Sequence, residues 1–154
     1  MAEPRWLSAD EQKSWRAFLT VSLLLHDQLG RDLQRSQGLT MADYEILVRL
    51  SEAPDRRLRM TDLASVTLSS KSRLSHQITR LEEAGLVERV ACAGDRRGFF
   101  ATLTDEGWTR LVGAAPRHVA SVREHLVDLL SPEEFADLGA ILQKVADHLV
   151  HIRE

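Results

Sequence analysis

The chain contains 154 residues, of which 44% are hydrophobic and 28% charged, and its formal net charge is −3. A chain of this length is large enough to bury a core but too short for two ordinary domains, so we expect one compact domain. No stretch approaches the ~18 uninterrupted apolar residues of a membrane span, and the first residues lack the basic and apolar regions of a signal peptide. We therefore expect a cytoplasmic protein without a membrane partner.

Cys92 is the only cysteine of the chain, which excludes an intramolecular disulfide. No group of cysteine and histidine residues has the spacing of a zinc site. We therefore expect neither a metal ion nor another cofactor.

A long helix is predicted over residues 8–37. Ser8 and Glu11 have the spacing of a capping box, which typically begins a helix. Apolar residues then recur at steps of three and four in a single stripe, until Gly38 ends the pattern. The stripe includes Trp15, Phe18, Leu19, Leu25, Leu29 and Leu33.

Three further helices are predicted before residue 86. One begins at Thr40 and ends before Pro54, and a short one begins at Thr61. After a brief turn, Ser69 or Ser70 can cap the next helix, which Gly85 ends. The two helices around this turn form a helix-turn-helix.

The last of these helices has a buried apolar face and a polar face. Leu74, Ile78 and Leu81 share one side, because they stand four and three residues apart. The polar residues are therefore exposed and can bond to base edges and phosphates. The candidate DNA contacts are Ser69, Ser70, Lys71, Ser72, Arg73, Ser75, His76, Gln77 and Arg80.

Charge is unevenly distributed along the chain. Residues 54–100 hold nine basic and six acidic side chains, although the whole chain is acidic. No acidic residue occurs between Ala64 and Leu81, a run that includes Lys71, Arg73 and Arg80. Such a surface attracts the phosphate backbone of nucleic acid.

A β-hairpin is predicted after the helix-turn-helix. Its strands are Leu86–Val90 and Phe99–Leu103, joined by a turn over residues 93–98. Arg96 and Arg97 lie in this turn, where guanidinium groups suit a narrow minor groove. The hairpin would be the wing of a winged helix, with Cys92 as a structural residue.

Long helices also follow the wing. One begins after Thr104, and a second after Ser131, with Pro132 at its first position. The long helices at both ends are too extended to be covered by one small DNA-binding domain, so we expect a second copy of the chain to cover them in a homodimer. Its two-fold symmetry would place two reading helices about 34 Å apart and predicts a palindromic operator in double-stranded DNA.

Three motifs together resemble the MarR family of bacterial transcriptional regulators. They are the run from Leu81 to Arg89, the Asp95-Arg96-Arg97 turn, and the run from Leu103 to Gly107. The resemblance covers the whole chain and is specific, because all three motifs occur in the right order and spacing.

The resemblance implies a mainly α (α+β) fold with a winged helix-turn-helix over residues 40–104 and dimerisation helices over 8–37 and 105–153. It implies that Asp95 orients the wing and that Arg97 enters the minor groove, with Arg89 and Arg96 as further candidate wing contacts.

The resemblance also implies a repressor released by a small aromatic effector. Candidate residues for the effector pocket are Trp15, Phe18, Tyr44 and Trp108. Redox-sensing members carry a cysteine near the N-terminal helix, which this chain lacks.

Two other function classes compete with this interpretation. A helical scaffold protein could keep the winged-helix shape without sequence-specific binding, and its interactions would depend little on salt. An enzyme is disfavoured, because the sequence has no nucleophile elbow, phosphate-binding glycine loop or metal-ligand spacing.

Overall fold

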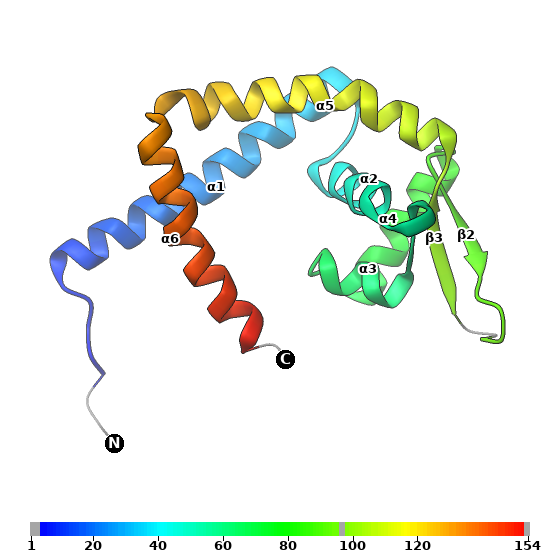
Figure 1. The fold of residues 1–154 in the computed structure, drawn as a ribbon, viewed down its shortest axis with the longest axis horizontal. Helices are drawn as coiled ribbons and strands as arrows, with labels where there is room; N and C mark the ends of the chain where they lie inside the picture. Colours follow the sequence, from blue (N-terminus) through cyan, green and yellow to red (C-terminus); the bar gives the residue numbers. More distant parts are fainter. Residues whose placement is uncertain (1–3, 96–97, 153–154) are drawn as a thin grey trace. The chain divides into compact units, whose positions relative to one another are not determined.

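The computed structural model describes residues 4–95 and 98–152 and shows a mainly helical chain with one small sheet (Figure 1). The expected α+β class is confirmed. The elements in chain order are α1 (Ala9–Gln37), α2 (Met41–Glu52), the 3-10 helix η1 (Pro54–Arg56), β1 (Arg57–Arg59), α3 (Met60–Val66), α4 (Lys71–Glu83), β2 (Val87–Ala91), β3 (Phe99–Leu103), α5 (Asp105–His125), the 3-10 helix η2 (Val127–Leu129) and α6 (Pro132–His151). The chain divides into two compact units, one up to His118 and one from Val119.

Side-chain caps begin the main helices where the sequence predicts them. Ser8, Thr40 and Ser131 each form a complete capping box with the acidic residue three positions later. Ser70 caps α4, and its hydroxyl accepts from the Arg73 N–H at 3.2 Å. Gly38 adopts the left-handed conformation (φ 65°) that ends α1. These caps satisfy backbone N–H groups that would otherwise lack partners.

The sheet has three antiparallel strands in the order β1-β3-β2. The predicted hairpin is confirmed: β2 pairs with β3 from Val87 opposite Leu103 to Ala91 opposite Phe99. Sequence analysis did not predict β1, which pairs with β3 through Leu58 opposite Ala101. Three residues with two exposed arginines carry too short an alternation to be recognised as a strand.

The core lies among α2, α3, α4 and the sheet. The most deeply buried large side chains are Ile46, Leu47, Leu50, Leu63, Leu74 and Ile78. Leu81 is also buried, so the predicted apolar face of α4 is confirmed. This packing fixes α4 on the domain and turns its opposite face to the surface.

The long terminal helices expose much apolar surface. In α1 only Leu29 and Leu33 are buried, and α6 has no buried residue. Among the residues that the structure covers, no helix combines the length and apolar character that a membrane crossing requires.

Candidate nucleic-acid interface

The outer face of α4 presents the polar residues that sequence analysis selected. Lys71, Ser72, Arg73, Ser75 and His76 are exposed, whereas Gln77 is half-buried. Within residues 4–95 and 98–152, neither Lys71 nor Arg73 takes part in an ion pair, so both charges face outward.

The two serines before α4 differ in their roles. The Ser70 hydroxyl is engaged as the cap, whereas the Ser69 hydroxyl is buried without a hydrogen-bond partner among the described residues. The backbone N–H of Ser69 donates to the Ala64 carbonyl at 3.0 Å, and Leu68 has a positive φ of 50°. The turn between α3 and α4 is therefore tightly closed.

Arg80 contacts the protein itself. Its guanidinium lies 2.7 Å from the Asp43 carboxylate on α2. Asp43 is buried and also accepts from the Thr40 N–H at 3.2 Å as part of the α2 capping box. Arg80 therefore joins α4 to the start of α2, a link between residues that are distant in sequence.

Arg89 is likewise engaged within the protein. Its guanidinium forms an ion pair with Glu82 and donates to the Ser75 carbonyl at 2.8 Å and the Thr79 hydroxyl at 3.2 Å. Its backbone N–H donates to the second oxygen of Glu82 at 2.8 Å. Sequence analysis made Arg89 a candidate DNA contact, but the structure turns it from β2 onto α4.

The wing tip is only partly described, because Arg96 and Arg97 lie outside the described residues. On either side of them, the Cys92 N–H donates to the Gly98 carbonyl at 2.9 Å and closes the hairpin. The Asp95 carboxylate lies 3.6 Å from the Arg59 guanidinium of β1. Cys92 is buried beneath this turn, as expected for a structural residue.

Two arginines of β1 form a feature that the sequence did not single out. The guanidinium groups of Arg57 and Arg59 lie 5.1 and 5.7 Å from the centre of the Phe100 ring on β3. Their basic character is visible in the sequence, but only the pairing of β1 with β3 reveals their common position over one ring.

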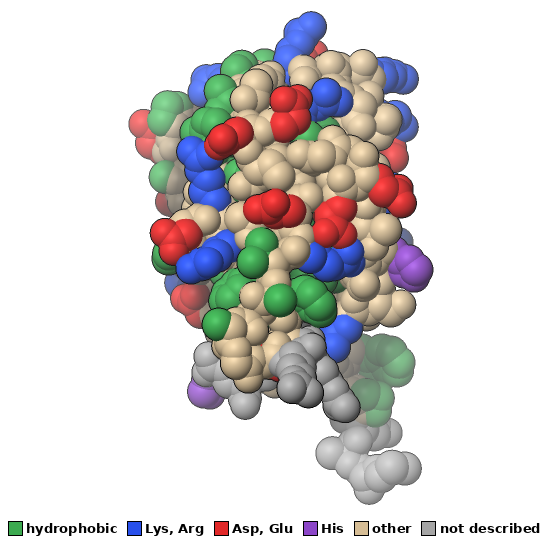
Figure 2. Space-filling model, turned by 90° about the vertical axis from the view of Figure 1, so that its right-hand side faces the viewer, with side chains coloured by type: hydrophobic (Ala, Val, Ile, Leu, Met, Phe, Trp, Pro, Cys, Tyr) green, Lys and Arg blue, Asp and Glu red, His purple; other side chains and the backbone are tan. Residues whose placement is uncertain are grey.

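Charges of both signs alternate on the face drawn in Figure 2, where Lys and Arg side chains are interspersed with Asp and Glu. Several arginines of residues 54–100 form local ion pairs, such as Arg57 with Asp55 at 3.2 Å, whereas Lys71 and Arg73 form none with the described residues.

The four aromatic candidates for an effector pocket occupy three separate environments. Trp15 and Phe18 stack at 6.0 Å on the exposed part of α1. Tyr44 is buried with its ring 4.6 Å from that of His118, and the Trp108 ring lies 4.3 Å from the Arg56 guanidinium. At least three hollows lie among residues 4–95 and 98–152, and none of these three is lined by any of the four aromatic residues.

The Tyr44 and His118 side chains share a poorly hydrated environment. Burial raises the pKa of the Tyr44 phenol and lowers the pKa of the His118 imidazole. The His118 Nδ1 atom is buried without a hydrogen-bond partner among the described residues. Burial therefore favours the neutral form of both groups.

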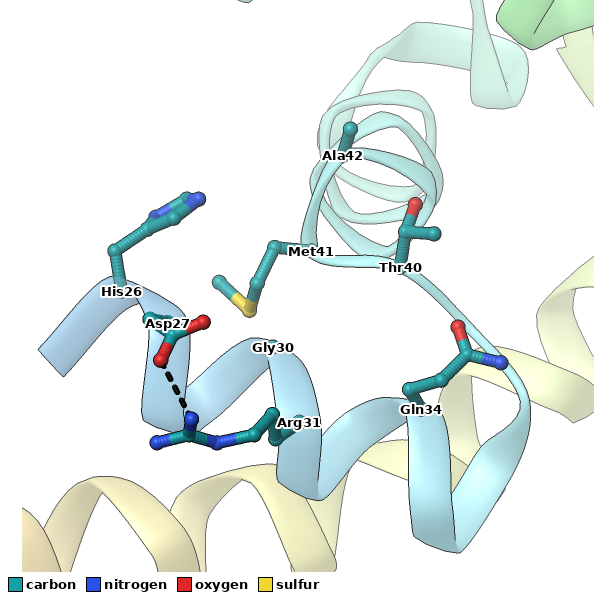
Figure 3. Close-up of a pocket in the computed structure, with 8 residues that line it drawn as sticks. All are labelled: His26, Asp27, Gly30, Arg31, Gln34, Thr40, Met41 and Ala42. Atoms are coloured by element: carbon teal, nitrogen blue, oxygen red, sulfur yellow. Dashed lines mark ion pairs between the residues drawn. The ribbon is translucent and has the colours of Figure 1, made fainter. Parts of the chain in front are cut away.

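A hollow of about 420 Å³ lies between α1 and α2 (Figure 3). The Met41 side chain projects into it, and Arg31 is paired with Asp27 at 2.8 Å. The hollow is lined by His26, Asp27, Gly30, Arg31, Gln34, Thr40, Met41 and Ala42. None of the four aromatic candidates lines it. No group of three or more potential metal ligands occurs in residues 4–95 and 98–152.

The chain is similar to known transcriptional regulators over most of its length. A family model described as "MarR family" matches residues 37–98. The HTH-type transcriptional regulator PecS of Dickeya dadantii is 33% identical over 86% of this chain and 80% of its own. MhqR of Bacillus subtilis, also an HTH-type transcriptional regulator, is 26% identical over 87% of this chain and 92% of its own.

Solved structures show the same architecture. AbsC of Streptomyces coelicolor, a MarR family transcriptional regulator, is 55% identical, with a TM-score of 0.89 over 96% of this chain and 99% of its own. Sco3205 of the same organism, a MarR family regulator crystallised in complex with DNA, is 49% identical, with a TM-score of 0.89 over 95% of this chain and 92% of its own. The fold, the sequence similarity and the exposed polar face of α4 all indicate the same family. The chain therefore belongs to the MarR family of transcriptional regulators, which are DNA-binding proteins and not enzymes.

Proposed function

We propose that the protein is a homodimeric repressor that recognises a palindromic operator. In each subunit α4 would lie in the major groove and the tip of the hairpin in the minor groove. The observation that carries the proposal is the exposed face of α4, where Lys71 and Arg73 lie among hydroxyl groups and form no ion pair with any other described residue. A face without carboxylates can approach phosphates and base edges closely.

Some α4 residues would contact base edges and others would contact phosphates. Arg73 and Gln77 suit base edges, because guanidinium and amide groups offer paired hydrogen bonds to guanine and adenine. Lys71, Ser72, Ser75 and His76 would bind phosphates or flanking bases, whereas the Ser69 hydroxyl is buried and the Ser70 hydroxyl caps α4. Arg96 and Arg97 would serve at the wing, oriented by Asp95. This last assignment rests on the family resemblance.

Apolar surface on the terminal helices supports the homodimer. On α1, Trp15 and Phe18 are 49% and 47% exposed, and on α6, Ile141 and Val145 are 60% and 50% exposed. Exposed large apolar side chains that gather on one helix are typical of protein interaction sites. A second copy of the chain would bury it and bring a second α4 to the next turn of the same DNA face.

Selection of bound sequences from random duplex DNA tests the proposal. We expect a palindrome whose half-sites are about 10 base pairs apart, centre to centre. An asymmetric site, or no enrichment, would contradict the two-fold arrangement. Transcription in vitro from a promoter that overlaps the selected site should fall as protein is added, whereas a rise would show activation.

Two variants separate the roles of helix and wing. Arg97→Ala should weaken binding without unfolding the protein and lower the salt dependence by about one phosphate contact. Arg73→Ala should relax the preference at one position of each half-site, at a cost of roughly 1–3 kcal/mol. If neither variant alters binding to the selected operator, the assignment of these elements to DNA is wrong.

A small aromatic effector would release the operator by binding a dimer geometry that DNA cannot accept. The α1–α2 hollow supports this part of the proposal, because it adjoins the start of α2, which Asp43 connects to α4. A panel of phenols and aromatic carboxylic acids should include one that lowers operator affinity and raises the melting temperature. A panel without effect on either quantity would remove the support.

A further inference from the structure

The contacts of Arg89 leave little of its side chain for DNA. Both terminal nitrogens donate within the protein, one to Glu82 and the other to Ser75 and Thr79. Only 22% of the Arg89 side chain is exposed. Reaching a phosphate would require breaking a charge-assisted pair and several hydrogen bonds.

Both carboxylate oxygens of Glu82 contact Arg89. One carboxylate oxygen accepts from the Arg89 backbone N–H and the other pairs with its guanidinium. The first contact fixes the backbone of β2, and the second fixes the side chain that returns to α4. Together they lock the start of the wing against the reading helix in one orientation.

The charge of Glu82 by itself should oppose DNA binding. Glu82 is an acid on α4, the helix proposed to approach the phosphates, and a carboxylate there repels DNA. Its neighbour Glu83 is also acidic but exposed, and no ion pair of Glu83 is found among the described residues. The two glutamates therefore form a matched pair in which only the first holds the wing.

We infer that Arg89 is a positioning residue, which acts with Glu82 to set the wing relative to α4 and does not itself contact DNA. The inference rests on the proposed use of α4 and the wing for DNA reading. It predicts that removing the negative charge of Glu82 weakens operator binding. Electrostatics alone would predict the opposite, because DNA repels a carboxylate on α4.

Glu82→Gln and Glu83→Gln, which make the same change in charge, test the inference. We expect Glu82→Gln to weaken operator binding by about tenfold, as for loss of a partly buried charge pair. Glu83→Gln should bind at least as tightly as the unaltered protein. Hydrogen exchange should show reduced protection at the Arg89 amide in Glu82→Gln, because a neutral amide oxygen accepts more weakly than a carboxylate, and unchanged protection at the core residue Leu47.

Arg89→Lys distinguishes positioning from direct contact. Lysine keeps the charge for a phosphate but lacks the planar fork that engages three groups of α4 at once. We expect Arg89→Lys to weaken binding as much as Glu82→Gln, and the double variant to be no weaker than either single variant. Full binding by Arg89→Lys, or additive losses in the double variant, would overturn the inference.

The variants that test the proposed function also distinguish its failure from failure of the inference about Arg89. If Arg73→Ala and Arg97→Ala weaken binding while Glu82→Gln behaves as Glu83→Gln, the inference about Arg89 is wrong and the DNA-reading surface stands. If all of these variants bind normally, both ideas are wrong.

Discussion

Asp43 is a buried acid whose carboxylate serves two neighbours, the Thr40 N–H and the Arg80 guanidinium. Asp43→Ala removes both contacts. We expect a loss of about 2 kcal/mol in the free energy of unfolding, less than for a fully buried pair because the Arg80 side chain is 57% exposed. Urea denaturation measures the difference.

Glu45→Ala provides the control on the same helix. Glu45 is exposed and lies 3.6 Å from Arg49 in a surface ion pair, which contributes little. We expect a change within about 0.5 kcal/mol. Equal losses in the two variants would show that burial of Asp43 has no energetic consequence.

We expect His118 to make the stability of the fold depend on pH. Because burial lowers its pKa in the folded state, the unfolded chain binds the proton more tightly. Stability should therefore fall as pH drops below about 6.5, the pKa of the unfolded histidine, and continue to fall through the lower pKa of the folded state.

His118→Gln should flatten this pH dependence, as measured by melting temperature between pH 7.5 and 5. Tyr44→Phe should retain it, because a phenol whose pKa is raised above 10 does not titrate in this range. If His118→Gln keeps the full slope, another group is responsible.

Single residues show what the sequence can and cannot predict about the site. Exposure of Lys71 and Arg73 follows from the spacing of Leu74 and Ile78 on one helix, so a local pattern was sufficient. The partners of Arg80 and Arg89 come from other elements, and no spacing along the chain indicates them. Both arginines therefore seemed equivalent to Arg73 in the sequence, although the structure engages them internally.

At the scale of elements, the start of α5 depends on a close approach to the loop before β2. A Cβ atom on Gly107 would lie 2.1 Å from the Leu86 carbonyl oxygen, which belongs to the backbone and cannot rotate away. The Gly107 N–H also donates to the Thr104 hydroxyl that caps the helix. Only glycine permits this junction.

Gly107→Ala should lower the free energy of unfolding by about 3 kcal/mol, because the helix must shift to relieve the clash. Gly113→Ala makes the same change in the same helix, where nothing lies within 4 Å. It should stabilise the protein by roughly 0.5–1 kcal/mol through helix propensity. Thermal and urea denaturation compare the two, and opposite signs are the expected result.

Helix ends were more predictable than the short elements between them. Ser8, Thr40 and Ser131 begin their helices as expected, and each forms a capping box, which the sequence analysis had not predicted for Thr40. In contrast, η1 contains two residues with positive φ, Asp55 and Arg56, and neither is glycine. Tertiary contacts hold this turn, including that of Arg56 with Trp108, so local propensity could not predict it.

At the scale of the whole molecule, operator binding should depend on assembly. Val145→Glu places a charge on the apolar face of α6, where burial in a dimer would be costly. We expect sedimentation to show a monomer and operator affinity to fall at least tenfold, because one half-site replaces two.

Gln143→Glu is the matched control for that variant. It adds the same charge to a side of α6 that carries polar side chains, where Gln143 donates to Asp147 at 2.7 Å. We expect the dimer and its operator affinity to survive. A dimeric Val145→Glu variant would instead place the interface away from α6.

The internal pairing of arginines also affects how the protein would distribute over a genome. Arg57, Arg59, Arg80 and Arg89 each face a carboxylate, and the whole chain carries a net charge of −3. Paired charges add little to the attraction that any DNA exerts, and that attraction dominates non-specific binding. With roughly 10⁶–10⁹ competing sites in a genome, weak non-specific binding leaves more protein free for its operators. The carboxylates in this DNA-binding unit thus favour selectivity, since they limit the time spent on irrelevant sequence.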